Sequence, residues 1–322
     1  MFTNLLSRAN LRLWPLLLIL WSVGLLACGT DPRLDVSAST QASTDTVRVG
    51  AFNMLRLGHG DSKDFSRVAE LITKADVDIM AGVEVMKPEA ASQLLAELNA
   101  EGDRRWGMEV TGEATGESSY KEHFAFFYDQ DRVRPATAAE DNYCDTEDTK
   151  WRASFSCTLE DRGSEENPEY ERDPMLAHFY FGDQKLSLLN VHVVFGEASR
   201  AGYARRQDEL KAVMAAMERI RAHSPEDEVI ALGDFNLERD TDREDPEGKY
   251  IPKWLDGAQV TVGGDTTLGR SNYDHTIHLG DNAGQVDQYE VVLDFDPTND
   301  RHKEAYKTEV SDHFPIAVEI EF

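Results

Sequence analysis

Short apolar runs with strand-like composition recur along the chain, and several of them end in a polar cluster. We predict strands over residues 47–52, 77–83, 124–128, 175–181, 186–195, 228–233, 258–262, 273–278, 286–293 and 314–320. The polar clusters at strand ends are Asn53, Glu84, Asp234 with Asn236, and Asp312 with His313. Because buried strands place the residues at their ends on the rim of a sheet, we expect these clusters to meet in one cleft.

Helical periodicity appears between the strands. Apolar residues recur at helical spacing after Asp64, the expected N-cap, and Pro88 opens a second helix. A third helix is predicted over residues 200–222, and residues 129–173 read as a long acidic loop. Mixed strands with a few helices favour two packed β-sheets flanked by helices, an α/β sandwich that forms one domain over residues 47–322.

The N-terminal segment, residues 1–27, has a different composition from the rest. Arg8 and Arg12 precede an apolar stretch that is short for a membrane span, and a small residue comes before Cys28. This pattern resembles a bacterial lipoprotein signal, which implies cleavage before Cys28 and acylation of its thiol. An uncleaved N-terminal anchor is the alternative, and either reading places the body outside the cytoplasm.

The next segment, residues 28–46, is rich in Ser, Thr, Ala and Asp and reads as a flexible tether after the lipidated cysteine. Gly29 in place of an aspartate resembles lipoproteins sorted to an outer membrane. We therefore expect a protein of the bacterial cell envelope, anchored to the membrane through the N-terminal lipid alone or released outside the cell.

Cysteine usage agrees with export. Setting Cys28 aside leaves Cys144 and Cys157, an even pair within the acidic segment. In an oxidising compartment they are expected to form a disulfide, and two free thiols are the alternative. Two isolated cysteines supply too few ligands for a metal site.

The charge balance bears on the substrate. The formal net charge is −27, and removing the signal with its two arginines and no acid leaves −29. Affinity for a nucleic acid backbone normally comes from Lys and Arg, so this balance argues against tight, sequence-specific DNA binding. It leaves open a nuclease in which bound cations locally offset the negative charge of the cleft.

The types of residue in the clusters suit hydrolytic chemistry. Carboxylates, carboxamides and two histidines, His192 and His313, are the groups needed to hold a hard divalent cation and activate water beside a phosphate. Taken one at a time, each residue has a plainer reading: Glu84 as a surface carboxylate, Asn53 and Asp234 as turn residues, His192 as a core histidine. The joint occurrence of the clusters in this order favours a shared site.

That order of clusters resembles the endonuclease/exonuclease/phosphatase superfamily, whose four-layer sandwich of two mixed sheets between helices matches the predicted architecture. The resemblance implies that Glu84 is the principal magnesium ligand, with Asn53 beside it and Asp312 contributing. Asp234 would orient or deprotonate the attacking water, and Asn236 would hold a phosphate oxygen. His192 and His313 would act at the scissile phosphate.

Two further segments, residues 119–122 and 171–174, resemble the deoxyribonuclease I branch. By that resemblance Glu122 pairs with His192, and Asp274 pairs with His313. Tyr120 would stack on the sugar and Arg172 would reach phosphate or the minor groove, without reading sequence. Asp265 and Thr267 resemble part of that branch's structural calcium loop, and a polar turn is the plainer reading of that segment.

The sequence thus predicts a monomeric, Mg²⁺- or Mn²⁺-dependent phosphodiesterase, with a possible structural Ca²⁺, that cuts DNA without sequence preference. A phosphatase or a sphingomyelinase-like phospholipid phosphodiesterase using the same centre is the second hypothesis. A surface binding protein that has kept the fold is the third, although none of the clusters is missing.

Overall fold

A computed structural model describes residues 46–60, 62–140, 143–153, 155–164, 169–239, 248–251, 254–255, 257–261, 264–280 and 286–322. Residues 43–322 cluster as one compact unit. The predicted signal over residues 1–27, the lipidated Cys28 and the tether lie outside the described residues, except that Thr46 already begins the first strand. Within the described part of the chain, no helix combines the length and the apolar character needed to span a bilayer.

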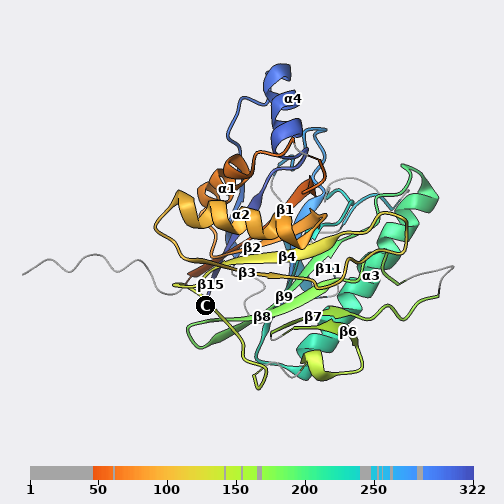
Figure 1. The fold of residues 1–322 in the computed structure, drawn as a ribbon. Helices are drawn as coiled ribbons and strands as arrows, with labels where there is room; N and C mark the ends of the chain where they lie inside the picture. Colours follow the sequence, from red (N-terminus) through yellow and green to blue (C-terminus); the bar gives the residue numbers. More distant parts are fainter. Residues whose placement is uncertain are drawn as a thin grey trace, which may run out of the picture. The chain divides into compact units, whose positions relative to one another are not determined.

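The first sheet has six strands, and its centre is built from both ends of the compact unit (Figure 1). β1 pairs in parallel with β2 and antiparallel with β15, so that Thr46 lies opposite Glu321. In spatial order the strands are β14 (Val286–Val291), β15 (Ile316–Glu321), β1 (Thr46–Leu57), β2 (Ile79–Val85), β4 (His123–Asp129) and β3 (Trp106–Val110).

The second sheet has nine strands, and its central pair, β9 and β10, is parallel. The remaining neighbours are antiparallel, and β5 (Arg134–Pro135) pairs with β8 at the side. In spatial order the others are β11 (Trp254–Leu255), β12 (Ala258–Thr261), β13 (Asp274–Leu279), β10 (Glu228–Asp234), β9 (Gln184–His192), β8 (Met175–Phe181), β7 (Ser156–Leu159) and β6 (Thr149–Arg152).

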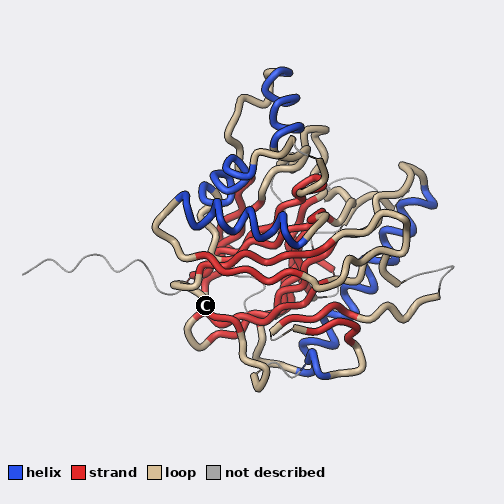
Figure 2. Tube along the Cα trace, in the orientation of Figure 1, coloured by secondary structure: helices blue, strands red, loops and turns tan. Residues whose placement is uncertain are grey.

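Three apolar layers hold the sheets and helices together. The central layer joins the inner faces of both sheets, with Val49 and Phe126 from one and Leu188 and Ile230 from the other. The outer layers lie beneath α1 (Phe65–Lys74) and α2 (Pro88–Glu101) on the first sheet and beneath α3 (Arg200–His223) on the second. Figure 2 shows the strands between these helices. The predicted four-layer sandwich of two mixed β-sheets flanked by helices is confirmed.

The predicted helix starts are confirmed as well. Asp64 caps α1 by accepting a hydrogen bond from the backbone N–H of Arg67, and Pro88 occupies the first turn of α2. A fourth helix, α4 (Asp300–Glu309), was not predicted. Because Tyr306 is its one buried residue, the segment carries no apolar stripe from which a helix could be read.

The prediction of an unbroken loop over residues 129–173 is wrong. This segment contains β5, β6, β7 and a short 3-10 helix, η1 (Tyr143–Asp145). These elements are two to four residues long, which is too short for a periodic pattern to stand out against many charges.

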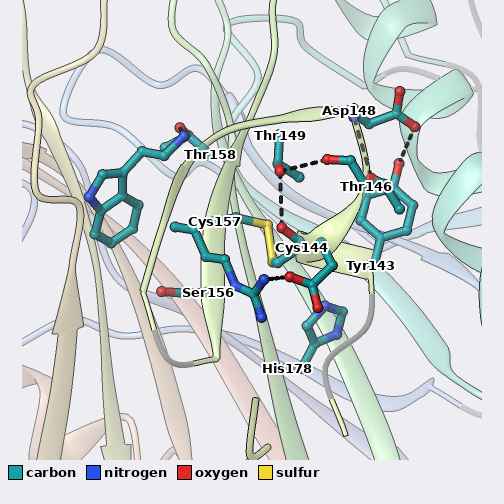
Figure 3. Close-up of a disulfide and its surroundings, with 12 residues drawn as sticks. Tyr143, Cys144, Thr146, Asp148, Thr149, Ser156, Cys157, Thr158 and His178 are labelled. Atoms are coloured by element: carbon teal, nitrogen blue, oxygen red, sulfur yellow. Dashed lines mark hydrogen bonds and ion pairs between the residues drawn. A yellow bond between two sulfur atoms is a disulfide. The ribbon is translucent and has the colours of Figure 1, made fainter. Parts of the chain in front are cut away.

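The disulfide predicted in the same segment is present. Cys144 of η1 and Cys157 of β7 are joined, with their Cα atoms 5.7 Å apart (Figure 3). The Thr149 hydroxyl group donates to the carbonyl oxygens of Cys144 and Thr146, each at 3.1 Å. The cross-link therefore ties the β6–β7 hairpin to the turn that precedes it.

Candidate active site

The ends of β1 and β2 lie side by side and are both irregular. The pairing of β1 with β2 shifts between Asn53 and Leu57, and the pairing of β2 with β4 shifts between Gly82 and Val85. At this point Glu84 has φ of 59°, in the left-handed region that L-residues rarely adopt. Bulges and such strained conformations are common at functional sites, because they turn a side chain out of the regular sheet.

In the second sheet, strand register alone brings three of the predicted residues together. His192 ends β9 and pairs with Asp234, which ends β10. Asp274 begins β13 and pairs with Asp234 from the other side. The preceding Gly233 has φ of 141°, and a Cβ atom there would lie 2.0 Å from the carbonyl oxygen of Val191, so only glycine fits.

Each histidine is held by its own carboxylate. His192 Nδ1 lies 2.7 Å from Glu122 Oε1, and His313 Nδ1 lies 2.8 Å from Asp274 Oδ2. The opposite nitrogen, Nε2, of both rings lies 3.7 Å from the same atom, Asp234 Oδ2. A carboxylate on Nδ1 fixes the tautomer of an imidazole and leaves Nε2 for chemistry. The Nε2 atoms of the two histidines therefore face the same oxygen atom of Asp234 from opposite sides.

The charges of this group are strongly coupled. Burial disfavours protonation of His313, but the carboxylates of Asp274 and Asp234 outweigh it and raise the His313 pKa from 6.5 to about 10. Burial likewise opposes protonation of His192, and the Glu122 carboxylate raises its pKa above 6.5. Burial raises the pKa of Asp234, against the attraction of both rings. At neutral pH, His313 is an imidazolium facing a carboxyl group.

Asn53 connects Asp234 to Glu84. Its Nδ2 donates to Asp234 Oδ2 at 3.0 Å and to Glu84 Oε1 at 3.1 Å. Glu84 Oε2 accepts further bonds from the backbone N–H of Arg56 at 3.1 Å and from the Tyr120 hydroxyl group at 2.7 Å. Burial would raise the Glu84 pKa, but His192 and these hydrogen bonds lower it overall. Glu84 is thus an ionised carboxylate in a half-buried position.

These residues fit a hard divalent cation. An amide N–H group between two carboxylates marks a position that favours positive charge, and carboxylate oxygens are the ligands such a cation prefers. Asp234, Asp274 and His313 also place donor atoms within 4.8 Å of one another. Asn53 Oδ1, the atom that could ligate, instead accepts the backbone N–H of Leu55 at 3.0 Å.

The other predicted members of the core lie close by. The Asn236 backbone N–H donates to Asp234 Oδ1 at 2.9 Å, while its side-chain amide donates to the Val193 carbonyl at 2.8 Å rather than pointing outward. Asp312 is one-third exposed, lies 3.9 Å from the Lys307 ammonium group, and lines the same cavity as Glu84 and Asp234.

Tyr120 and Arg172, predicted to touch substrate, also support the site from within. The Tyr120 hydroxyl bonds Glu84, and the Arg172 guanidinium group lies 5.6 Å from the centre of the Tyr120 ring. Arg172 Nε lies 3.3 Å from Glu122 Oε2, and Nη1 donates to the His192 carbonyl at 3.3 Å. Both residues still line a cavity, so contact with a substrate stays a prediction.

Asp265 and Thr267 are placed differently. Thr267 forms a β-bridge with His313, whereas Asp265 is exposed. Both line a further cavity of about 480 Å³, and Thr267 also lines the cavity over the histidines. Their role as calcium ligands stays a prediction.

Two adjoining cavities, of about 600 and 410 Å³, open over the histidines and Glu84. They share Leu55, Glu84, His192, Phe195 and Lys307. Sequence reasoning missed the cations of the larger cavity other than Arg172, namely Arg56, Lys63 and Lys307. Lys307 comes from α4, and Arg56 from the irregular end of β1, neither of which carries a recognisable signal in the sequence.

Comparison with known proteins agrees with this arrangement, although no family model matches the chain. The chain is 22% identical over 288 residues to deoxyribonuclease-1-like 1 of Cricetulus griseus, covering 86% of this chain and 84% of that protein. Its structure resembles that of an endonuclease/exonuclease/phosphatase family protein from Bacteroides thetaiotaomicron, with a TM-score of 0.55, 16% identity, and coverage of 85% of this chain and 97% of the other.

The chain has the endonuclease/exonuclease/phosphatase fold. The sequence similarity to a deoxyribonuclease-1-like protein agrees with the predicted resemblance. A third protein with this fold is the mannosyl-6-phosphatase Bt3783 of B. thetaiotaomicron, with a TM-score of 0.55, 16% identity, and coverage of 86% of this chain and all of the other. The proteins that this chain resembles thus include one named as deoxyribonuclease-like and one named as a phosphatase.

Proposed function

We propose that this protein is a divalent-metal-dependent phosphodiesterase that cuts DNA without sequence preference. The observation that carries the proposal is the pair of carboxylate-bound histidines whose Nε2 atoms both lie 3.7 Å from Asp234 Oδ2, beside the Glu84 carboxylate. Groups that can transfer protons and a site suited to a cation thereby line one cavity of about 410 Å³.

Glu84, with Asn53 and Asp312, would hold Mg²⁺ or Mn²⁺, which supplies charge stabilisation at a phosphoryl oxygen when bound. Asp234 would accept a proton from the attacking water, and burial raises its pKa, which makes the carboxylate a stronger base. The imidazolium of His313 donates to a phosphoryl oxygen or to the departing 3′ oxygen, and His192 acts from the opposite side. Asn236 is proposed to bind a further phosphate oxygen.

The location proposed for this activity is outside the cytoplasm. The Cys144–Cys157 disulfide supports it, because such cross-links persist in oxidising compartments. Lipidation at Cys28 stays part of the proposal.

A phosphatase or phospholipid phosphodiesterase is the second candidate. A protein named as a phosphatase shares the fold, and a net charge of −27 disfavours approach of a long polyanion. Against it stand the homology to a deoxyribonuclease-like protein and four cationic side chains in the larger cavity, those of Arg56, Lys63, Arg172 and Lys307.

The test is to incubate the purified protein with plasmid DNA, sphingomyelin, inositol phosphates and sugar phosphates, first with Mg²⁺ and then with EDTA. We expect DNA to be cut with Mg²⁺ only, and His192→Ala and His313→Ala each to lower the rate by roughly 10²–10⁴-fold without unfolding the protein. Intact DNA together with hydrolysis of another phosphoester would replace the nuclease by the second candidate.

A further inference from the structure

An exposed aromatic ring stands at the edge of the active site. Phe195 lies three residues after His192 and lines both of the cavities described above. Among the described residues it is the large hydrophobic side chain that stands out as exposed, with 61% of its surface accessible. Single exposed apolar residues are common, but this one sits where a substrate must pass.

The loop that carries Phe195 is held by a buried arginine. Arg206 of α3 is 1% exposed, and its Nη2 donates to the carbonyl oxygens of Phe195 and, at 2.9 Å, of Gly196. Its Nη1 donates to the Asn236 carbonyl at 2.9 Å, which ties the loop to the other side of the site. A buried guanidinium that caps several carbonyls resists movement, because breaking any bond leaves an unpaired polar group.

A second buried residue of α3 fixes the start of the same loop. Glu209, one helical turn after Arg206, accepts the backbone N–H of Val194 at 2.6 Å. The Arg206 guanidinium also covers the Phe195 ring at 5.3 Å from its centre. With one side of the ring against Arg206 and most of its surface exposed, the ring has a fixed position and an accessible face.

We infer that Phe195 is a stacking surface for a nucleobase next to the scissile phosphate. This inference rests on the proposed function and names the part of the substrate that the protein recognises. A rigid apolar ring beside a phosphate site complements a ligand that joins a flat π-face to a charged phosphate. A nucleotide has both parts, whereas a sugar phosphate or an inositol phosphate has no such face. Stacking tolerates any base, in keeping with cleavage that ignores sequence.

The test compares two single-stranded oligonucleotides of equal length and charge, one of thymidines and one of abasic tetrahydrofuran sites, with the purified protein and Mg²⁺. We expect the wild type to cut both and to have a lower KM for the thymidine strand. Phe195→Ala should raise KM for that strand roughly 5- to 100-fold and change KM for the abasic strand by less than about twofold. Phe195→Leu, which keeps an apolar side chain without the ring, should behave as Phe195→Ala does, whereas Phe195→Trp and Phe195→Tyr should restore the preference.

Binding without turnover gives a second measurement. Subtracting the wild-type fluorescence from that of Phe195→Trp gives the emission of the introduced tryptophan. In EDTA, we expect the thymidine strand to quench this emission and the abasic strand to leave it unchanged. Equal effects of Phe195→Ala on the two strands, or none, would refute stacking. Loss of binding to phosphatidylglycerol vesicles instead would identify the ring as a membrane contact. A wild type that cuts plasmid DNA but neither strand would refute stacking alone, whereas one that cuts none of the three would remove the nuclease proposal and the stacking surface together.

Discussion

Glu122 and Asp274 have the same role on opposite sides of the cleft, since each orients one histidine. Both are fully buried, and each bonds Nδ1 of one histidine at less than 3 Å. Since the other nitrogen of each ring faces Asp234, the two carboxylates decide which way the imidazoles point and where their protons reside. The chemistry of the site thus depends on residues that no substrate atom needs to touch.

Replacing Glu122 by Gln tests this dependence. The amide keeps the shape but removes the charge that raises the His192 pKa, so His192 loses its proton at a lower pH. We expect kcat on plasmid DNA to fall roughly 10²-fold or more, with the descending limb of the pH profile shifted towards acid. Circular dichroism should show a folded protein. Glu113→Gln, at an exposed carboxylate nearby, is the matched control, and equal rates for the two variants would remove Glu122 from the mechanism.

The site residues at strand ends could be predicted from the sequence, whereas the residues that support the site from a helix could not. His192, Asp234 and Asp274 follow or begin apolar runs, and in sheets such positions converge. Arg206 and Glu209 lie in a helix whose buried face is otherwise apolar, so charged residues there look like solvent-facing ones. Phe195 looked like the continuation of its strand, whereas the strand ends at His192.

At the scale of elements, α3 is more than a cover for the second sheet. Near its start it buries Arg206 and Glu209 among otherwise apolar positions, and both bond the backbone after β9. Glu209 also accepts the backbone N–H of Glu171, next to Arg172. The helix thus links the two segments that flank His192 and Glu122.

Glu209 should make stability depend on pH. Burial raises its pKa from 4.5 to about 6, against the hydrogen bonds from Val194 and Glu171. The folded chain therefore binds this proton more tightly than the unfolded chain, and the resulting stability is complete below pH 4.5 and is lost as pH rises through 6. We expect the free energy of unfolding of the wild type, taken relative to that of Glu209→Gln, to fall by about 2 kcal/mol between pH 4 and pH 7.

Urea unfolding of both proteins at the two pH values measures this difference. Glu209→Gln will itself be destabilised, because its NH₂ group faces one of the two backbone donors, but that cost does not vary with pH. Parallel pH dependence in the two proteins would mean that Glu209 titrates as it does in the unfolded chain.

The elements that the sequence concealed share a physical reason. β5, β6, β7 and β11 are too short to show a period, and α4 buries Tyr306 alone. Pairing to longer neighbours stabilises these strands, and such tertiary contacts leave no local trace in composition. β3 was also not predicted, since only its first two residues are buried. The other longer strands and α1, α2 and α3 were predictable because each buries a continuous face.

At the scale of the whole molecule, charge is distributed unevenly. The chain carries −27 overall, yet Arg56, Lys63, Arg172 and Lys307 line the larger of the two cavities over the site. Burial lowers the Lys63 pKa to about 8, which leaves it charged at neutral pH. An anionic substrate is therefore repelled at a distance and attracted once it enters the cleft.

This distribution predicts a weak response to salt. Raising NaCl from 50 to 200 mM weakens the contacts with the four cations but also screens the surrounding acids, so the two effects oppose each other. We expect KM for DNA to change by less than about tenfold, where a basic nuclease making 6–10 phosphate contacts loses roughly 10³–10⁵ in affinity. Lys307→Gln should raise KM at low salt and make KM depend still less on the salt concentration. A hundredfold rise in the wild-type KM would show that contacts with the cations dominate.

The position of β15 has a consequence for when activity can begin. It lies between β14 and β1 in the interior of the first sheet, and His313 comes three residues before it. A polypeptide that leaves the ribosome or a secretion channel N-terminus first cannot complete that sheet, or supply the second imidazole, until this stretch has emerged. The complete pair of histidines is therefore available only after nearly the whole chain has emerged.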